Sequence, residues 1–183
     1  MNIRFTVSIV SLLLAAAASS PAQQAVLGLA GGGTYSDFSS PDTPSRWGFS
    51  GGLFAGVQTY GSLNTLEVSY TQKGGKGTRI DYVETGITVG GFAKSGSGRA
   101  RAYGGITVAF PVSCNATNAP RTGFCDNTNT EWGIPVGIML GKGQPTGGFV
   151  GLDVRYTIPL TDASLGTYNN TWMFRLVIGR PKG

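Results

Sequence analysis

Apolar residues occupy every second position along most of the chain, and the stretch FVGLDVRYTIP, residues 149–159, shows this pattern most clearly. Its apolar residues run from Val150 to Ile158, and Asp153 and Arg155 lie between them. A period of two predicts a β-strand with one apolar face and one polar face.

Seven further segments alternate in the same way. The eight predicted strands span residues 26–35, 47–59, 63–72, 79–92, 99–112, 130–140, 149–159 and 170–178. Each has roughly 10 to 14 residues, whereas strands in soluble domains usually have about five or six. Strands of this length can cross a bilayer at a tilt. The sequence therefore predicts an all-β fold, an eight-stranded antiparallel up-and-down transmembrane β-barrel.

The direction in which the two strand faces point separates two kinds of barrel. In a membrane barrel the apolar face meets lipid and the polar face lines the lumen. A soluble exported barrel of the lipocalin type, which binds a small apolar ligand, needs the opposite facing. The long strands favour the membrane barrel, and the lipocalin-like barrel is the alternative.

The first 22 residues have the three parts of a secretory signal peptide. Residues 1–4 carry one positive charge, residues 5–18 are apolar, and Ser20-Pro21-Ala22 places small residues at the expected cleavage site. A transmembrane anchor needs about 20 apolar residues, more than this run offers. We therefore expect a signal peptide over residues 1–22 and an outer-membrane β-barrel domain over residues 23–183.

The composition is compatible with a barrel and argues against nucleic-acid binding. The 183 residues include 30 Gly and no His, 13% are charged, and the mean hydropathy is +0.04. Because apolar and polar residues alternate in its strands, a membrane barrel can have a mean hydropathy near zero. The net charge of +5 comes without a basic run interleaved with aromatic residues, so we expect no nucleic-acid partner.

Longer and shorter connections between the predicted strands tend to alternate. The connections span residues 36–46, 60–62, 73–78, 93–98, 113–129, 141–146 and 160–169. Outer-membrane barrels have short periplasmic turns and longer external loops. This pattern predicts that both chain termini lie on the periplasmic side.

Six aromatic residues share the apolar parity of their strands and lie near the longer connections. They are Trp47, Tyr70, Phe110, Trp132, Tyr156 and Trp172. Amphipathic rings are stable at the level of lipid headgroups, so these residues predict an aromatic girdle at one membrane interface. In a soluble protein the same rings would instead close one end of the core.

Five segments resemble a known family. They are GLAGGGTYSDF, LEVSYTQKG, YVETGITVGGF, YGGITVAFPV and FVGLDVRYTIPLTD. The chain resembles the outer-membrane protein β-barrel domain family that includes PorT-like proteins, and more distantly the OmpA, OmpX and opacity-type small barrels. The resemblance implies an eight-stranded barrel in the outer membrane of a Gram-negative bacterium, with outer-membrane lipid and the barrel-assembly machinery as partners. The sequence identifies no extracellular or periplasmic protein partner.

Both cysteines, Cys114 and Cys125, lie in the longest connection. An exported chain meets an oxidising compartment, so we expect a disulfide between them, and two free thiols are the alternative. With two thiols and no His, the sequence predicts no metal site and no cofactor.

Charged residues on the polar parity point into the predicted lumen. Glu67, Asp153, Arg155 and Arg175 fall at similar middle depths, and the third and seventh strands of an eight-stranded ring lie opposite each other. A charge in so confined a space must be paired, so we expect these four to form ion pairs that plug the lumen. Further charges on the same parity are Glu84, Arg101 and Glu131.

The residue types argue against catalysis. Small membrane enzymes usually rely on a His as general base, and this chain has none. Carboxylates that face arginines inside a barrel are more often structural than catalytic. We therefore expect no enzyme but a structural or surface-interaction role, with a His-independent membrane enzyme as the weaker alternative.

Overall fold

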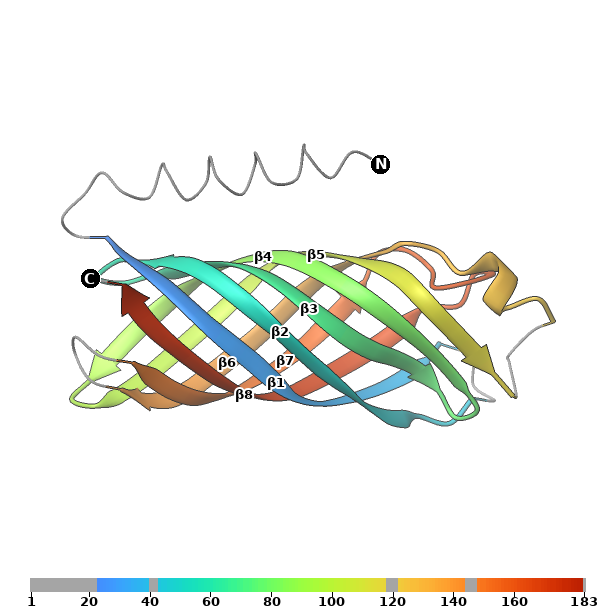
Figure 1. Ribbon diagram of the computed structural model, residues 1–183, viewed down its shortest axis with the longest axis horizontal. Helices are drawn as coiled ribbons and strands as arrows, with labels where there is room; N and C mark the ends of the chain where they lie inside the picture. The colour runs from blue at the N-terminus through green and yellow to red at the C-terminus, as the bar shows by residue number, and fades with distance from the viewer. Residues whose placement is uncertain (1–22, 40–42, 118–121, 144–147, 183) are drawn as a thin grey trace.

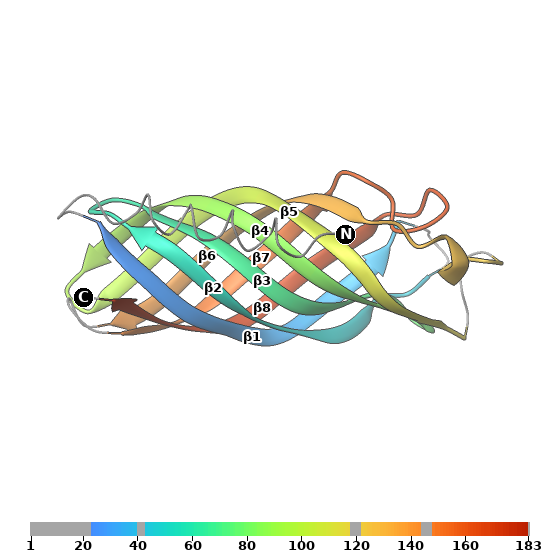
Figure 2. The ribbon, with the colours of Figure 1, turned by 45° about the horizontal axis from the view of Figure 1, so that its top comes forward.

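The computed structural model describes residues 23–39, 43–117, 122–143 and 148–182, so the predicted signal peptide lies outside the described residues. The strands are β1 (Gln24–Phe38), β2 (Arg46–Gln58), β3 (Leu63–Gly75), β4 (Thr78–Ser95), β5 (Gly98–Ala116), β6 (Glu131–Gly143), β7 (Phe149–Pro159) and β8 (Asn169–Lys182). Each strand pairs antiparallel with the next, and β8 pairs with β1 to close a barrel (Figures 1 and 2). The predicted up-and-down barrel is confirmed.

All strands except β2 and β7 are longer than predicted, and the difference changes a connection where β3 and β4 meet. The connection predicted over residues 73–78 is wrong, because β3 continues to Gly75 and β4 begins at Thr78. Gly77 adopts a φ of 82°, a left-handed conformation that glycine reaches without strain, so residues 76 and 77 suffice for the turn. Lys73 therefore lies inside a strand and not in a loop.

The faces of the strands point as a membrane barrel requires. Leu152 is 66% exposed on the outside, whereas its neighbour Asp153 is 3% exposed and points into the lumen. Along β3, β4, β6 and β8, exposed residues that are mostly apolar alternate with inward-pointing residues in the same way, and these strands bring Glu67, Glu84, Glu131 and Arg175 into the lumen. The lipocalin-like alternative, which needs apolar residues inside the barrel and charged residues outside, is therefore wrong. Among the described residues, no helix is both long and apolar enough to span a membrane.

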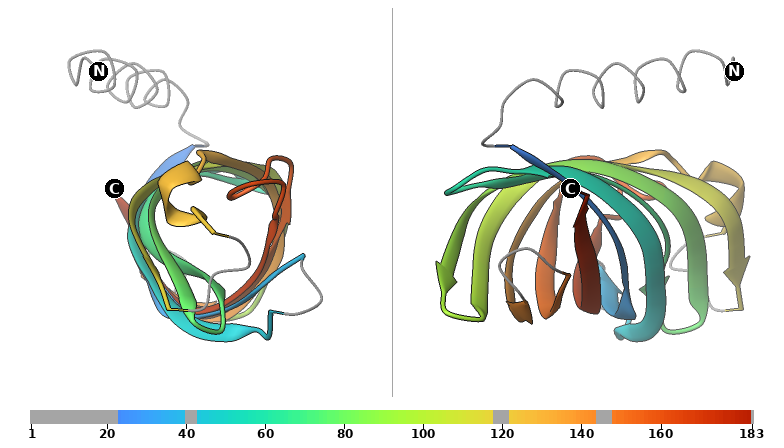
Figure 3. Two further views of the ribbon diagram at one scale, coloured as in Figure 1. Left: turned by 90° about the vertical axis from the view of Figure 1, so that its right-hand side faces the viewer. Right: turned by 60° about the vertical axis from the view of Figure 1, so that its left-hand side comes forward.

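The two rims of the barrel differ. The beginning of β1 and the end of β8 lie at one rim, which we call the terminal rim, together with the turns between β2 and β3 and between β4 and β5 (Figure 1). The opposite rim, which we call the loop rim, carries the longer connections 39–45, 117–130 and 160–168. A short 3-10 turn, η1 (Cys125–Asn127), lies over the mouth of the barrel at the loop rim (Figure 3).

Candidate functional site

The lumen is filled by side chains in layers, and β3 shows their order. Its inward residues, from the terminal rim to the loop rim, are Leu63, Thr65, Glu67, Ser69, Thr71 and Lys73, all of them buried. Leu63 belongs to an apolar layer, Glu67 to a central cluster of charges, Ser69 and Thr71 to a hydroxyl layer, and Lys73 to a second cluster of charges. The lumen is therefore a packed core and not an open channel.

The apolar layer closes the lumen at the terminal rim. It consists of Val26, Ala30, Phe54, Leu63, Phe92, Met139, Phe149 and Val177. Phe92 and Phe149 have the polar parity of their strands and point inward. They therefore seal the lumen instead of facing lipid.

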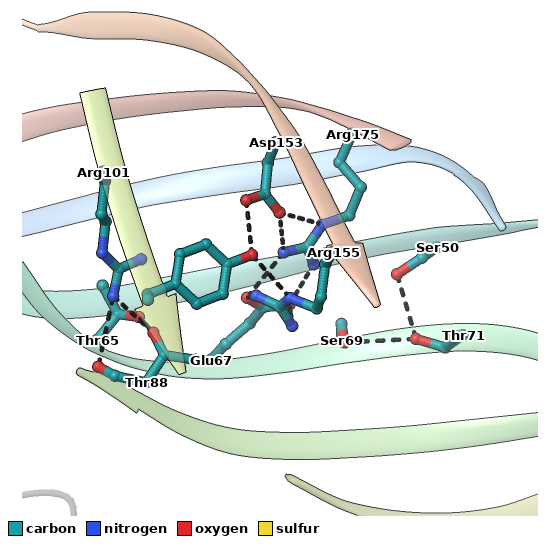
Figure 4. A network of polar contacts seen from close by, with 11 residues as sticks. Ser50, Thr65, Glu67, Ser69, Thr71, Thr88, Arg101, Asp153, Arg155 and Arg175 are labelled. Carbon is teal, nitrogen blue, oxygen red and sulfur yellow. Dashed lines mark hydrogen bonds and ion pairs between the residues drawn. The ribbon is translucent and has the colours of Figure 1, made fainter. Parts of the chain in front are cut away.

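The central charge cluster joins Glu67, Asp153, Arg155 and Arg175, the four residues predicted to meet (Figure 4). Glu67 on β3 binds two arginines from the opposite wall. Its Oε2 atom lies 2.8 Å from Arg155 Nη2, and its Oε1 atom accepts from Arg175 Nη1. Arg175 Nη2 also lies 2.8 Å from Asp153 Oδ2, the carboxylate directly across from it in the β7–β8 ladder. Two acids and two arginines thus neutralise each other with few unused hydrogen-bonding groups.

Tyr103 completes the central charge cluster and was not predicted to do so. Its hydroxyl donates to Asp153 Oδ1 at 2.6 Å and accepts from Arg155 Nε at 3.1 Å. The ring fits because Gly137 lies beside it on β6. A Cβ atom at position 137 would come within 2.6 Å of the Tyr103 hydroxyl oxygen and within 2.8 Å of the Val154 carbonyl oxygen.

Arg101 lies in the lumen as predicted by parity, but it forms no ion pair within the described part of the chain. Its guanidinium donates to Thr88 Oγ1 at 2.6 Å and lies 4.5 Å from the centre of the Tyr103 ring (Figure 4). Thr88 in turn shares a hydrogen bond of 2.7 Å with Thr65. Hydroxyl and aromatic groups, and not a carboxylate, therefore hold this charge.

The second cluster, which we call the outer charge cluster, brings together two predicted lumen charges, Glu84 and Glu131. Lys73 Nζ lies 2.9 Å from Glu84 Oε2 and 3.4 Å from Glu131 Oε2. The Tyr82 hydroxyl donates a hydrogen bond to Glu131 Oε1, and Asn169 Nδ2 lies 2.5 Å from the same oxygen. Lys73 was not predicted as a member, because it begins the run KGGKG, which was assigned to the connection over residues 73–78.

An apolar cap lies above the outer charge cluster at the loop rim. Phe124, just before η1, is 1% exposed, and its ring lies 5.1 Å from that of Phe38. Ser164 from the β7–β8 connection donates to the Phe124 carbonyl at 2.7 Å. The predicted disulfide between Cys114 and Cys125 is present and ties η1 to the end of β5. These contacts therefore hold the described segment around Phe124 and Cys125 at the barrel mouth.

The six residues of the predicted aromatic girdle all point away from the lumen. Tyr156 and Trp172 lie with ring centres 4.8 Å apart, and Trp47 lies 5.1 Å from Tyr35 and 6.2 Å from Phe174. The remaining members, exposed or half-buried on the outside, are Tyr70, Phe110 and Trp132. Their place near the loop rim suits one interface of a bilayer.

The chemistry of the lumen is that of a closed electrostatic core. Each carboxylate of the two charge clusters, on Glu67, Glu84, Glu131 and Asp153, lies within ion-pair distance of an arginine or a lysine. These four acids are matched by four bases of the two clusters and their surroundings, namely Lys73, Arg101, Arg155 and Arg175. Within the described ranges, no group of three or more His, Cys, Asp or Glu residues could hold a metal ion.

Comparisons with known proteins show the fold. No protein-family model matches the sequence, and a search among curated proteins finds no match. The crystal structure of Neisserial surface protein A superposes with a TM-score of 0.64 at 11% identity, covering 86% of this chain and 99% of that one. Two further structures are outer membrane protein OprG of Pseudomonas aeruginosa (TM-score 0.46, 13% identity, 88% and 96% covered) and the attachment invasion locus protein Ail of Yersinia pestis (0.41, 11%, 85% and 99%). The chain thus has the fold of the small eight-stranded outer-membrane β-barrels.

Proposed function

We propose that this protein is a closed outer-membrane barrel that does not conduct solutes and that acts as a structural or surface-interaction protein. The observation that carries this proposal is the bridging of Glu67 to both Arg155 and Arg175 across the lumen. Eight strands leave an interior just wide enough for side chains to fill, and here ion pairs fill its centre.

The space left inside supports a closed barrel. The central cavity, lined by Glu67, Arg101 and Asp153 among others, has a volume of about 20 Å³. Such a space holds about one water molecule. The apolar layer and the apolar cap lie toward the two ends of the lumen and support the proposal independently of this cluster.

A surface role is favoured over a catalytic one by the way the carboxylates are used. General acid–base catalysis needs a group within reach of a substrate. The lumen carboxylates are buried and bound to cations, whereas the loop rim presents exposed residues such as Leu160 and Tyr168. External loops are the usual place for contacts with other molecules. The PorT-like resemblance, which rests on the five sequence segments, is part of the same proposal, as are the barrel-assembly machinery and a still unidentified protein partner.

Single-channel recording in planar bilayers tests the proposal. The mature barrel is expected to show no stable conductance under conditions in which an open porin conducts. Conductance of porin size that persists when Glu67 or Arg155 is changed to Gln would refute a closed lumen. Heat-modified mobility on gels, measured for each variant, establishes that the recorded protein is folded.

A further inference from the structure

The charged side chains of the described part of the terminal rim are all basic. Five basic residues lie in the strands at this end of the barrel, namely Lys94, Arg99, Lys142, Arg180 and Lys182. No Asp or Glu occurs in the described segments that form it, residues 23–30, 54–65, 90–100, 137–143, 148–151 and 176–182. The loop rim differs, because it mixes the basic residues Arg46, Lys76 and Arg79 with four acidic ones, Asp37, Asp81, Asp126 and Asp162.

Of the four basic side chains that the structure describes at this rim, three can be reached from outside, and Lys94 also lies 5.5 Å from the centre of the Phe92 ring. Lys94, Lys142 and Arg180 are exposed. Arg99 is not, because its guanidinium is buried and donates to the carbonyls of Gly96 and Gly98 in its own turn. Lys142 and Arg180 share the parity of the lipid-facing residues of their strands. They therefore stand on the outer surface of the barrel wall.

Lys142 and Arg180 mark the end of the apolar exterior. Lys142 pairs with Val150, which pairs with Ile178, two residues before Arg180. Val150 and Ile178 are 45% and 51% exposed to the outside. A basic residue directly beyond lipid-facing residues lies at the depth of the lipid headgroups.

A groove joins Lys142 to the apolar residues Val150 and Ile178, and Arg180 follows Ile178 by two residues on β8. The groove has a volume of about 580 Å³ and is lined by Ser97, Lys142, Gly143, Gly148, Phe149, Val150 and Ile178. One end of the groove is therefore basic and the other apolar, as a lipid requires.

We propose that the terminal rim binds phospholipids whose headgroup carries a net negative charge. Lys142 and Arg180 hold the headgroup phosphate, and an acyl chain lies along Val150 and Ile178. A zwitterionic lipid has the same phosphate, but its own ammonium group compensates the charge. In the described part of this rim, no Asp or Glu side chain is present to repel an anionic headgroup.

Native mass spectrometry of the mature barrel in detergent measures this preference directly. Phosphatidylglycerol and phosphatidylcholine with identical acyl chains are offered together. The parent protein is expected to retain phosphatidylglycerol preferentially. Changing Lys142 and Arg180 to Gln should weaken its binding about thirtyfold, the factor for two basic contacts at an anionic lipid surface.

The control variant removes two charges from the loop rim, Arg46→Gln with Lys76→Gln, and should bind like the parent. Equal retention of the two lipids by the parent, or equal loss of phosphatidylglycerol in both double variants, would overturn the proposal. Glycerol phosphate, which has no acyl chains, should not displace phosphatidylglycerol at matched concentration. Full displacement would contradict a lipid site and indicate a site for small anions. Co-sedimentation with purified peptidoglycan that depends on Lys142 and Arg180, without lipid preference, would assign the rim to the cell wall instead.

Discussion

Glu67 on β3 and Arg155 on β7 face each other across the lumen and are separated by 88 residues in the sequence. No local interaction can form this pair, because their strands lie on opposite walls of the barrel. The pair exists only when β8 has closed against β1. Its contribution to stability is therefore a measure of barrel closure.

Removing one member of this pair should be costly. Arg155→Met leaves Glu67 partly uncompensated in the lumen, which typically costs about 3 to 5 kcal/mol of unfolding free energy. Adding Glu67→Gln should recover part of this loss, since Asp153 and Arg175 then remain as a balanced pair. Urea unfolding in detergent micelles measures both. The control is Lys76→Met, which removes an exposed lysine from the β3–β4 turn and should change stability by less than about 0.5 kcal/mol. Equal costs for the two single variants would contradict a buried ion-pair core.

The outer charge cluster should depend on Lys73 in the same way. Lys73→Met leaves Glu84 and Glu131 facing each other without a cation and should destabilise the barrel by about 3 kcal/mol or more. Lys76→Met, in the exposed turn three residues on, is the matched control and should change stability by less than about 0.5 kcal/mol. If Lys73→Met unfolds at the same urea concentration as Lys76→Met, the cluster contributes nothing to stability.

The facing of the strands can be tested with a charge on the outside. Leu152→Arg and Val68→Arg each place a charge on the lipid side at mid-depth, which costs about 2 to 4 kcal/mol. Both should lower the yield of folded protein in vesicles, scored by heat-modified gel mobility. Leu160 is 53% exposed just beyond β7, so Leu160→Arg should lower the folded yield only slightly. Asp153→Asn should also lower it less than either mid-depth arginine. Normal folding of both mid-depth variants together with failure of Asp153→Asn would mean that the facing is inverted.

The disulfide should be complete in protein taken from the cell envelope. The unreduced protein should weigh two hydrogens less than the reduced one and should resist alkylation at Cys114 and Cys125. Changing both to Ser should cost roughly 2 to 3 kcal/mol and should speed amide hydrogen exchange around Phe124. Residues 63–72 of β3 serve as the internal control and should exchange as before. Alkylation of both thiols in freshly isolated protein would exclude the bond.

Most of the fold could be predicted because a period of two is a property of the sequence itself. Alternation located all eight strands and their lipid-facing sides, and depth along the strands grouped Glu67 with Asp153, Arg155 and Arg175. The parity of a residue tells whether its side chain points to lipid or into the lumen, but not which groups on other strands the side chain reaches. For this reason the role of the Tyr103 hydroxyl was not predicted, nor was the hydrogen bonding of Arg101 to Thr88.

Strand ends were less predictable than strand centres. Lys73 lies in a run with three glycines, and composition alone favours a loop there. In the barrel, cross-strand pairing extends β3 to Gly75 and turns Lys73 into the lumen. Phe92 and Phe149 were not assigned a place for a related reason, since large rings on the polar parity make sense only once the lumen is known to be packed.

The close fit of Tyr103 against Gly137 means that the charge network depends on a residue that has no side chain to contribute. A methyl group at position 137 would act as a wedge and push the tyrosine hydroxyl away from Asp153 and Arg155. Gly137→Ala should therefore loosen the ion pairs much as Tyr103→Phe does, although neither change removes a charge. Residues that matter for keeping this barrel shut extend in this way to positions that a survey of charged residues alone would pass over.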